Sequence, residues 1–180
     1  QVIIQSCLKW YNVAPNPPTT NLNQWVVTAL LFPILPLIAG TCGNAGAQSS
    51  ARIVRAIALG HISKNQRLKA IGREFKIALV TGLVLITING VRMIIIDLIQ
   101  QSNQFNLRQS LPWKVILVAT ITLYWTELVA KSLGASLPFM LQFVKIDPAL
   151  ASVPLVTTLI DGLTTTIFFG VGAIVILPYL

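Results

Sequence analysis

Charged side chains are scarce in this sequence. Only 10% of its 180 residues are Asp, Glu, Lys or Arg, whereas a soluble domain carries about 25%. Hydrophobic residues make up 54% of the chain, and the mean hydropathy is +0.75. This composition excludes a soluble globular domain and predicts an integral membrane protein.

Cysteine and histidine are also nearly absent. Cys7 and Cys42 make no disulfide framework, and Cys42 lies in an apolar run where a buried free thiol is expected. His61 is the only histidine and stands in a basic stretch, where it is most simply solvated. We find no metal-binding Cys/His cluster, no Ser-His-Asp set and no phosphate-binding glycine loop. The sequence therefore predicts neither a zinc or copper site nor an enzyme.

The apolar residues gather in runs long enough for membrane-spanning helices, which need about 20 residues each. The runs cover residues 25–59, 77–98, 112–144 and 149–180. They are continuous, unlike the alternating strands of a membrane barrel. We therefore expect an all-α, polytopic membrane helix bundle with four spanning helices, forming one domain from residue 25 to 180.

Residues 1–24 differ from the rest. Residues 1–12 would form only about 18 Å of helix, too short to span a membrane, and residues 14–23 are a proline-rich connector. We expect residues 1–12 to be either an interfacial piece or the outer tail of a first helix. Because the sequence lacks an initiator Met, we expect a fragment of a longer chain.

Basic residues indicate the orientation of the bundle. Seven of the 13 lie in the connection between the first two spans, residues 52–76, which predicts that this connection is cytoplasmic, at a plasma (inner) membrane. An aromatic belt would then lie at the outer interface, formed by Trp10, Tyr11, Trp25, Trp113 and Tyr179. Topology and contact with anionic membrane lipids explain the bases, and no nucleic-acid-binding fold accompanies them.

Only five residues are acidic, and four of them have simple explanations. Glu74 lies among the basic residues and is expected to be their solvated partner. Asp97 closes the second span near the outer surface. Asp147 precedes a proline, the pattern of a helix cap followed by a first residue that needs no amide donor. Glu127 precedes Lys131 by four residues, the favourable order for an intramembrane ion pair on one helix.

Asp161 is the acidic residue that calls for a function. It lies 14 residues after Asp147, or about 21 Å along a helix, at the depth of the bilayer interior. An ionised carboxylate there costs at least about 2.5–3.5 kcal/mol, so it must face a partner, a cavity or an ion. Its sequence neighbours are small or hydroxylated. An ion pair with Lys131 or Arg92 is one explanation, and an ion site is the favoured one.

The first span contains a run of small residues in which Gly40, Gly43 and Ala47 share one helical face. Two explanations are open. The small residues allow close helix packing, or Pro33 and Pro36 interrupt the helix and free backbone carbonyls to line a cavity. A buried carboxylate facing backbone and amide oxygens is an all-oxygen environment, which hard cations prefer. Mg²⁺ in particular keeps several waters and binds only one or two carboxylates.

Three segments carry a resemblance to a known family. They are PLIAGTCGNAGAQ at residues 36–48, GASLPF at residues 134–139 and DPALASVPLVTTLID at residues 147–161. Together, and at the same spacing, they resemble the MgtE family of divalent-cation channels from about residue 25 to 180.

The resemblance implies a homodimer with five membrane helices per subunit and the pore at the dimer interface, this chain supplying the last four helices. It also implies that Asp161 from each subunit holds a largely hydrated Mg²⁺, the transported ion, near Gly43 and Asn44. Asp147 matches a position at the cytoplasmic mouth that some members use in gating. The pore-lining positions that the resemblance implies are Gly40, Ala47, Ala51, Val153 and Thr157.

The sequence departs from the family at several points. Ala47, Ala51 and Val153 are apolar where some members are polar, Cys42 replaces a common glycine, and Lys131 stands where Asn is familiar. The cytoplasmic domains that sense internal Mg²⁺ in many members are not in this sequence, either because they were cut off or because this is a short branch of the family. Gating by those domains is therefore not assumed here.

The expected function is magnesium transport, through a channel that conducts Mg²⁺ or other divalent cations into the cytoplasm down the electrochemical gradient. One alternative is a carrier coupled to Na⁺ or H⁺. Another is a non-transporting membrane subunit in which Asp161 pairs with a base on a partner helix.

Overall fold

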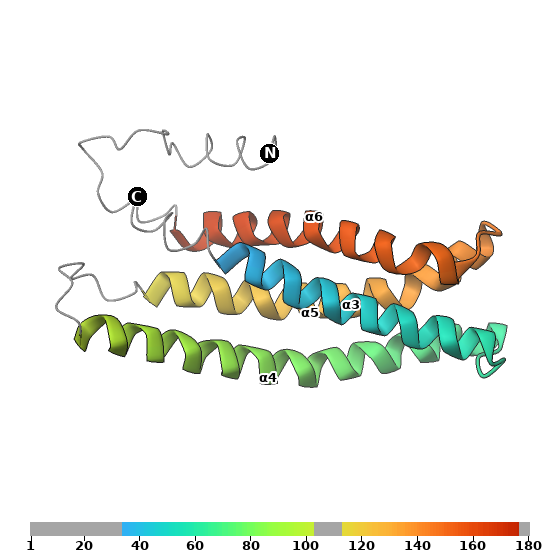
Figure 1. The fold of residues 1–180 in the computed structure, drawn as a ribbon, viewed down its shortest axis with the longest axis horizontal. Helices are drawn as coiled ribbons and strands as arrows, with labels where there is room; N and C mark the ends of the chain where they lie inside the picture. Colours follow the sequence, from blue (N-terminus) through green and yellow to red (C-terminus); the bar gives the residue numbers. More distant parts are fainter. Residues whose placement is uncertain (1–33, 103–112, 177–180) are drawn as a thin grey trace.

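The computed structural model describes residues 34–102 and 113–176, which are helical apart from two short connections (Figure 1). The helices are α3 (Ile34–Ala58), α4 (Arg67–Ser102), α5 (Trp113–Phe143) and α6 (Pro148–Ile176), with a short 3-10 turn, η1 (Lys64–Gln66), before α4. No strand occurs in these two ranges. The predicted all-α helix bundle is confirmed. The expectations for residues 1–33, among them the outer helix tail, lie outside the described residues.

Local sequence explains where α3 ends. Gly60 adopts φ +70°, the left-handed conformation that favours glycine. The N–H groups of Gly60 and His61 then donate to the carbonyls of Ile57 (3.0 Å) and Ala56 (2.9 Å), the pattern of a Schellman cap. The chain can thus turn directly into η1 and α4.

The basic connection is largely helical. Residues 52–58 belong to the last turns of α3, and α4 begins at Arg67 rather than at residue 77, where the apolar run begins. Lys and Arg are good helix formers, so the helix extends past the end of its apolar segment. The charged residues therefore sit on rigid helix ends.

Three helices contain segments long and apolar enough to cross a membrane, which are Arg67–Ile95, Ile116–Phe143 and Ser152–Val175. The segment Ile34–Ala58 is not among them, because its glycine, serine and arginine residues lower its hydropathy. The apolar residues 25–33 of the predicted first span lie outside the described residues. The chain is a membrane protein, and a fourth crossing by the first predicted span stays a prediction.

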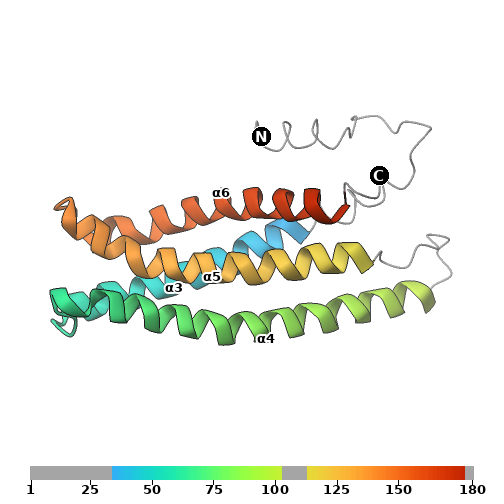
Figure 2. The same cartoon turned by 180° about the vertical axis from the view of Figure 1, so that it is seen from behind.

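Helix α5 lies at the centre of the bundle. It packs against α3, α4 and α6, while α3 also packs against α6. Figures 1 and 2 show α4 at one edge of the bundle and successive helices running in opposite directions. The core between α3, α5 and α6 is formed largely by Ile38, Cys42, Val118, Leu123, Val156, Ile160 and Phe168.

Two glycines allow the closest approach in this core. A Cβ atom on Gly46 would collide with Ile160 and lie 2.9 Å from the Ala130 carbonyl oxygen. A Cβ on Gly134 would collide with the carbonyl group of Gly46. The backbones of α3 and α5 therefore meet at this pair. Close helix packing is one of the two explanations considered for the face of Gly40, Gly43 and Ala47. The structure shows this role for Gly46, the residue before Ala47.

Candidate cation site between α3 and α6

Asp161 lies on α6 within the membrane-length segment Ser152–Val175, beside the glycine-rich part of α3. A Cβ atom built on Gly43 would stand 3.8 Å from the Asp161 Oδ1 atom, and no other described atom outside the adjoining part of α3 comes within 4 Å of that position. The structure thus brings together two residues predicted for the metal site. The absence of a side chain at Gly43 leaves open the space directly in front of the carboxylate.

The Asp161 side chain is exposed and has no hydrogen bond or ion pair with any described residue. The two bases considered as its partners are engaged elsewhere. Lys131 Nζ lies 3.6 Å from Glu127 Oε1, and the Arg92 guanidinium donates to Asn89 Oδ1 at 3.0 Å. The alternative in which one of these bases neutralises Asp161 is therefore wrong within the described chain.

The other predicted pore residues lie along the same two helices. On α6, Val153 and Thr157 precede Asp161 by eight and four residues, and these spacings place all three on one helical face. Val153 is exposed and Thr157 is half-buried. The Thr157 hydroxyl donates to the Pro154 carbonyl at 3.0 Å, so its oxygen can still accept a hydrogen bond from water.

On α3, the predicted residues form a stripe next to the contact with α6. Gly40, Asn44 and Ala51 are exposed, Ala47 is half-buried, and Gly43 is buried against Asp161. Asn44 has no hydrogen-bond partner among the described residues, so its amide is free to bind water. Of the two glycines, Gly43 has the Asp161 carboxylate next to it, whereas nothing lies within 4 Å of a Cβ position on Gly40.

The backbone of α3 is a regular helix from Ile34 to Ala58. Pro36 lies within this range, and the described helix continues past it without interruption. Pro33 lies outside the described residues. The expectation of an interrupted backbone with freed carbonyls is therefore wrong between Gly40 and Gln48. The oxygen atoms offered by the α3 stripe and by the neighbouring face of α6 are side-chain oxygens, those of Asn44, Thr157 and Asp161.

Asp147 lies at the start of α6, at the same end of the bundle as η1 (Figure 1). Its Oδ1 accepts a hydrogen bond from the Ala149 backbone N–H at 2.9 Å, which is the helix cap expected from the Asp-Pro sequence. The side chain is exposed, so its second carboxylate oxygen remains accessible to water or to a cation.

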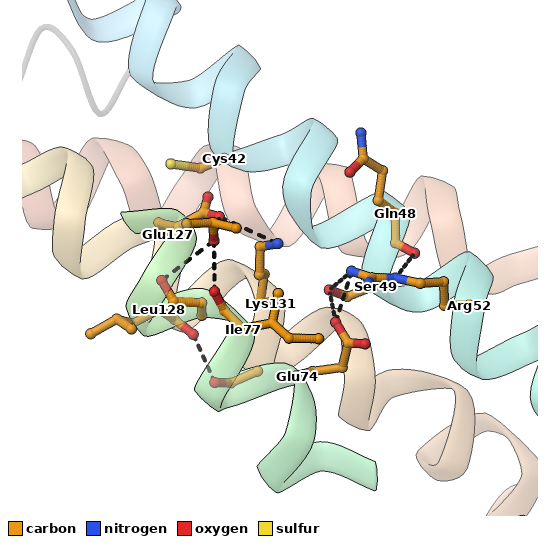
Figure 3. Close-up of polar contacts among 12 residues, drawn as sticks. Cys42, Gln48, Ser49, Arg52, Glu74, Ile77, Glu127, Leu128 and Lys131 are labelled. Carbon is orange, nitrogen blue, oxygen red and sulfur yellow. Dashed lines mark hydrogen bonds and ion pairs between the residues drawn. The ribbon is translucent and has the colours of Figure 1, made fainter. Parts of the chain in front are cut away.

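A second polar cluster lies between α4 and α5 (Figure 3). The Glu127 carboxylate pairs with Lys131, and its Oε1 also accepts a hydrogen bond from the Thr81 hydroxyl at 3.0 Å. Glu127 and Lys131 are 1% and 5% exposed. The two opposite charges lie next to each other within the bundle, so this cluster joins two helices without leaving a net charge.

The expectation that Glu74 is solvated is wrong, because Glu74 is only 5% exposed. Its Oε2 accepts hydrogen bonds from Ser49 Oγ at 2.7 Å and from Arg52 Nη2 at 2.9 Å (Figure 3). Ser49 and Arg52 lie three residues apart on α3, so both reach the same carboxylate on α4. The sequence indicated a basic partner for Glu74, but only the arrangement of α3 beside α4 buries the Glu74 carboxylate, while the Arg52 side chain stays exposed.

The described residues do not include a group of three His, Cys, Asp or Glu side chains that could enclose a metal ion. The carboxylate between α3 and α6 is a single one. Such a site suits a cation that keeps most of its water, as Mg²⁺ commonly does, better than a metal held by protein ligands alone.

Comparison with known proteins identifies the family. The model of the MgtE family, described as divalent cation transporter, matches residues 35–171. This chain belongs to the MgtE family. The resemblance carried by the three sequence segments is thereby confirmed, and the match includes all the residues predicted for the cation site.

Individual MgtE relatives agree with this assignment. The chain is 32% identical over 146 residues to the "Magnesium transporter MgtE" of Bacillus subtilis, covering 81% of this chain and 29% of that protein. It is 30% identical over 154 residues to the protein of the same name from Thermus thermophilus, covering 83% and 30%. The chain thus spans less than a third of the length of these curated relatives.

Proposed function

We propose that this chain forms the ion-conducting membrane part of a magnesium transporter, a channel that admits Mg²⁺ or related divalent cations to the cytoplasm. Membership of the MgtE family and the names of the matched relatives support the substrate class. The channel mechanism, the direction of transport and the dimer described below are parts of the proposal.

The observation that carries the proposal is the unpaired carboxylate of Asp161. It is exposed on a membrane-length helix, beside exposed apolar side chains such as Leu159 and Leu163. An ionised group at this depth is not stable against lipid tails. Since no described base neutralises it, its natural counter-charge is a cation that comes from solution.

A second copy of the chain completes the site in this proposal. Most of the α3 stripe and of the Asp161 face of α6 is exposed in the single chain, including Asn44, Ala51 and Asp161. In a two-fold symmetric homodimer joined at this surface, both subunits contribute the same patch, and residues next to the axis meet their own copies. We place Asp161 next to that axis. Two Asp161 carboxylates would then flank one hydrated Mg²⁺, with Gly43 leaving room for its waters and Asn44 positioned to bind them.

Conduction needs no energy source besides the membrane potential. A divalent cation gains about 4.6 kcal/mol on crossing 100 mV of inside-negative potential. We propose that the Asp161 pair offsets part of the lost hydration energy at the pore centre. Selectivity would then depend on the pore width and the retained water shell more than on direct ligation.

The test is Mg²⁺ uptake into liposomes containing the purified chain, with an inside-negative potential and no Na⁺. The Asp161→Asn variant should lose uptake while keeping its helical content. Asp97→Asn is the matched control, because it makes the same chemical change on α4, which lies away from the α3–α6 surface. We expect the control to conduct.

Two outcomes would contradict the channel. Uptake that begins only when a Na⁺ or H⁺ gradient is added would indicate a coupled carrier. Normal uptake by Asp161→Asn would show that the cation site is elsewhere.

The basic end of the bundle is proposed to lie in the cytoplasm, at the plasma (inner) membrane. Exposed residues at this end, such as His61, connect α3 to η1. In a Cys7→Ser background, a His61→Cys variant should react with a membrane-impermeant thiol reagent only after cells are opened. Labelling of intact cells would contradict this orientation, because it would place the basic end outside the cell.

A further inference from the structure

Helix α4 has a basic and apolar stripe on the side that faces away from the bundle. The exposed bases on it are Lys69, Arg73 and Lys76, and the exposed apolar residues that follow are Val80, Leu83, Val84, Val91 and Ile94. At about 100° per residue, all eight positions fall within about 60° of one line along the helix. The bases and the apolar residues are therefore parts of one continuous surface.

The opposite side of α4 makes the helix contacts. Its buried residues are Glu74, Ala78, Gly82, Asn89 and Met93, and α5 is the main helix against which α4 packs. Figures 1 and 2 both show α4 at the edge of the bundle. No described helix covers the stripe.

The positive charge of the stripe is not compensated. Lys69, Arg73 and Lys76 form no hydrogen bond or ion pair with any described residue. The neighbouring carboxylate, that of Glu74, is buried and already held by Arg52 and Ser49. The three bases are therefore available to an anionic partner.

The spacing of charge and apolar surface matches a phospholipid. Val80 begins the apolar part, and Lys76 lies one turn before it, about 6 Å along the axis. The headgroup layer on each side of a bilayer is about 5–8 Å thick, so Lys76 lies at phosphate depth when Val80 lies at the hydrocarbon edge. Arg73 lies one turn further out, and its long side chain can reach the same level.

We propose that this surface of α4 binds an anionic phospholipid. Arg73 and Lys76 hold the headgroup, Lys69 adds charge one turn further out, and an acyl chain lies along Val80, Val84 and Val91. A lipid fits better than a soluble phosphate compound because the bases lead directly into an apolar stripe. The binding does not depend on the proposed transport function and can be measured without it.

The test uses the purified chain in phosphatidylcholine vesicles that contain spin-labelled phosphatidylglycerol. The immobilised fraction of the label gives the preference for the anionic lipid. The double variant Arg73→Gln/Lys76→Gln should lower this preference about 10–30-fold, the loss expected for two bases at a membrane surface. The double variant Arg55→Gln/Lys145→Gln removes two exposed bases from the same end of the bundle, but not from α4. It should keep the preference of the unmodified chain.

Equal losses in the two variants would overturn the proposal, because they would indicate diffuse attraction to the basic end. No loss in the α4 variant would also overturn it.

The apolar part of the α4 surface has its own test. Soluble glycerophosphoglycerol, which lacks acyl chains, should compete poorly with the lipid, and effective competition would contradict the acyl-chain contact. Finally, Val84→Cys in the Cys7→Ser background should not cross-link two chains in the membrane. Cross-linking there would show that a second copy covers the stripe.

Discussion

Gly43 of α3 and Asp161 of α6 are direct neighbours, with 3.8 Å between the Asp161 Oδ1 atom and the place where a Gly43 side chain would begin. A methyl group at this point would make an ordinary van der Waals contact with the carboxylate, so the fold would tolerate it. The same methyl group would, however, occupy the space in front of the carboxylate. Folding and ion binding therefore respond differently to the same substitution.

A first prediction follows from this contact. Gly43→Ala should leave the folded chain at least as stable as before, because Ala favours a helix over Gly by about 0.8–1.0 kcal/mol. Mg²⁺ uptake into liposomes should nevertheless fall at least several-fold, because the methyl group displaces water beside Asp161. Gly90→Ala, which adds a methyl group in open space on α4, is the control and should not affect uptake. Full uptake by Gly43→Ala would remove Gly43 from the site.

A second prediction concerns the close packing at Gly46. A side chain here collides with Ile160 and approaches the backbone of α5, so Gly46→Ala should destabilise the bundle by about 1–3 kcal/mol. The measurement is the midpoint of unfolding in detergent, with Gly90→Ala again as control. If the unfolding midpoint of Gly46→Ala equals that of Gly90→Ala, the α3–α5 contact is looser than the structure shows.

A third prediction concerns the Glu127–Lys131 pair. Glu127→Gln or Lys131→Met alone leaves one buried charge without its partner and should destabilise the chain by about 3–5 kcal/mol. The double variant Glu127→Gln/Lys131→Met should recover much of this loss, because no uncompensated charge remains. Unfolding free energies of the four chains form a double-mutant cycle. Strictly additive losses would mean that the two charges do not interact.

A fourth prediction separates two roles of Asp147. Asp147→Ala removes the cap of α6 and should cost about 0.5–2 kcal/mol of stability, whereas Asp147→Asn keeps a capping oxygen and should cost little. Both variants remove the negative charge. If Asp147 also binds cations at the pore mouth, the two should alter the Mg²⁺ dependence of transport equally. A change confined to Asp147→Ala would assign the residue to capping alone.

Some features of this protein depend only on residues close together in the sequence. The Asp147 cap joins residues two apart, and the Glu127–Lys131 pair joins residues four apart. Helix geometry places such residues side by side whatever the rest of the chain does, so their spacing was sufficient to predict these contacts. The all-α class and the membrane location follow from long apolar runs, which are a property of composition.

Other features depend on how each helix is rotated about its own axis. The sequence placed Glu74 among basic residues but did not indicate its burial against Ser49, 25 residues away. It marked small residues on α3 but did not single out Gly46 as the one that meets α5. Nor did it show that α3 stays a regular helix beyond Pro36.

Composition and spacing by themselves determined that this is a helical membrane protein with a carboxylate, Asp161, inside an apolar segment of membrane-spanning length, a capped α6 and an ion pair on α5. Only the tertiary structure decided that Asp161 faces Gly43, that Gly46 meets Gly134, and that the outward-facing bases of α4, Lys69, Arg73 and Lys76, have no partner among the described residues. The physical reason is that rotating one helix by 100° replaces every side chain at its interface. The rotation that occurs is set by the simultaneous packing of all the helices, and not by any single segment.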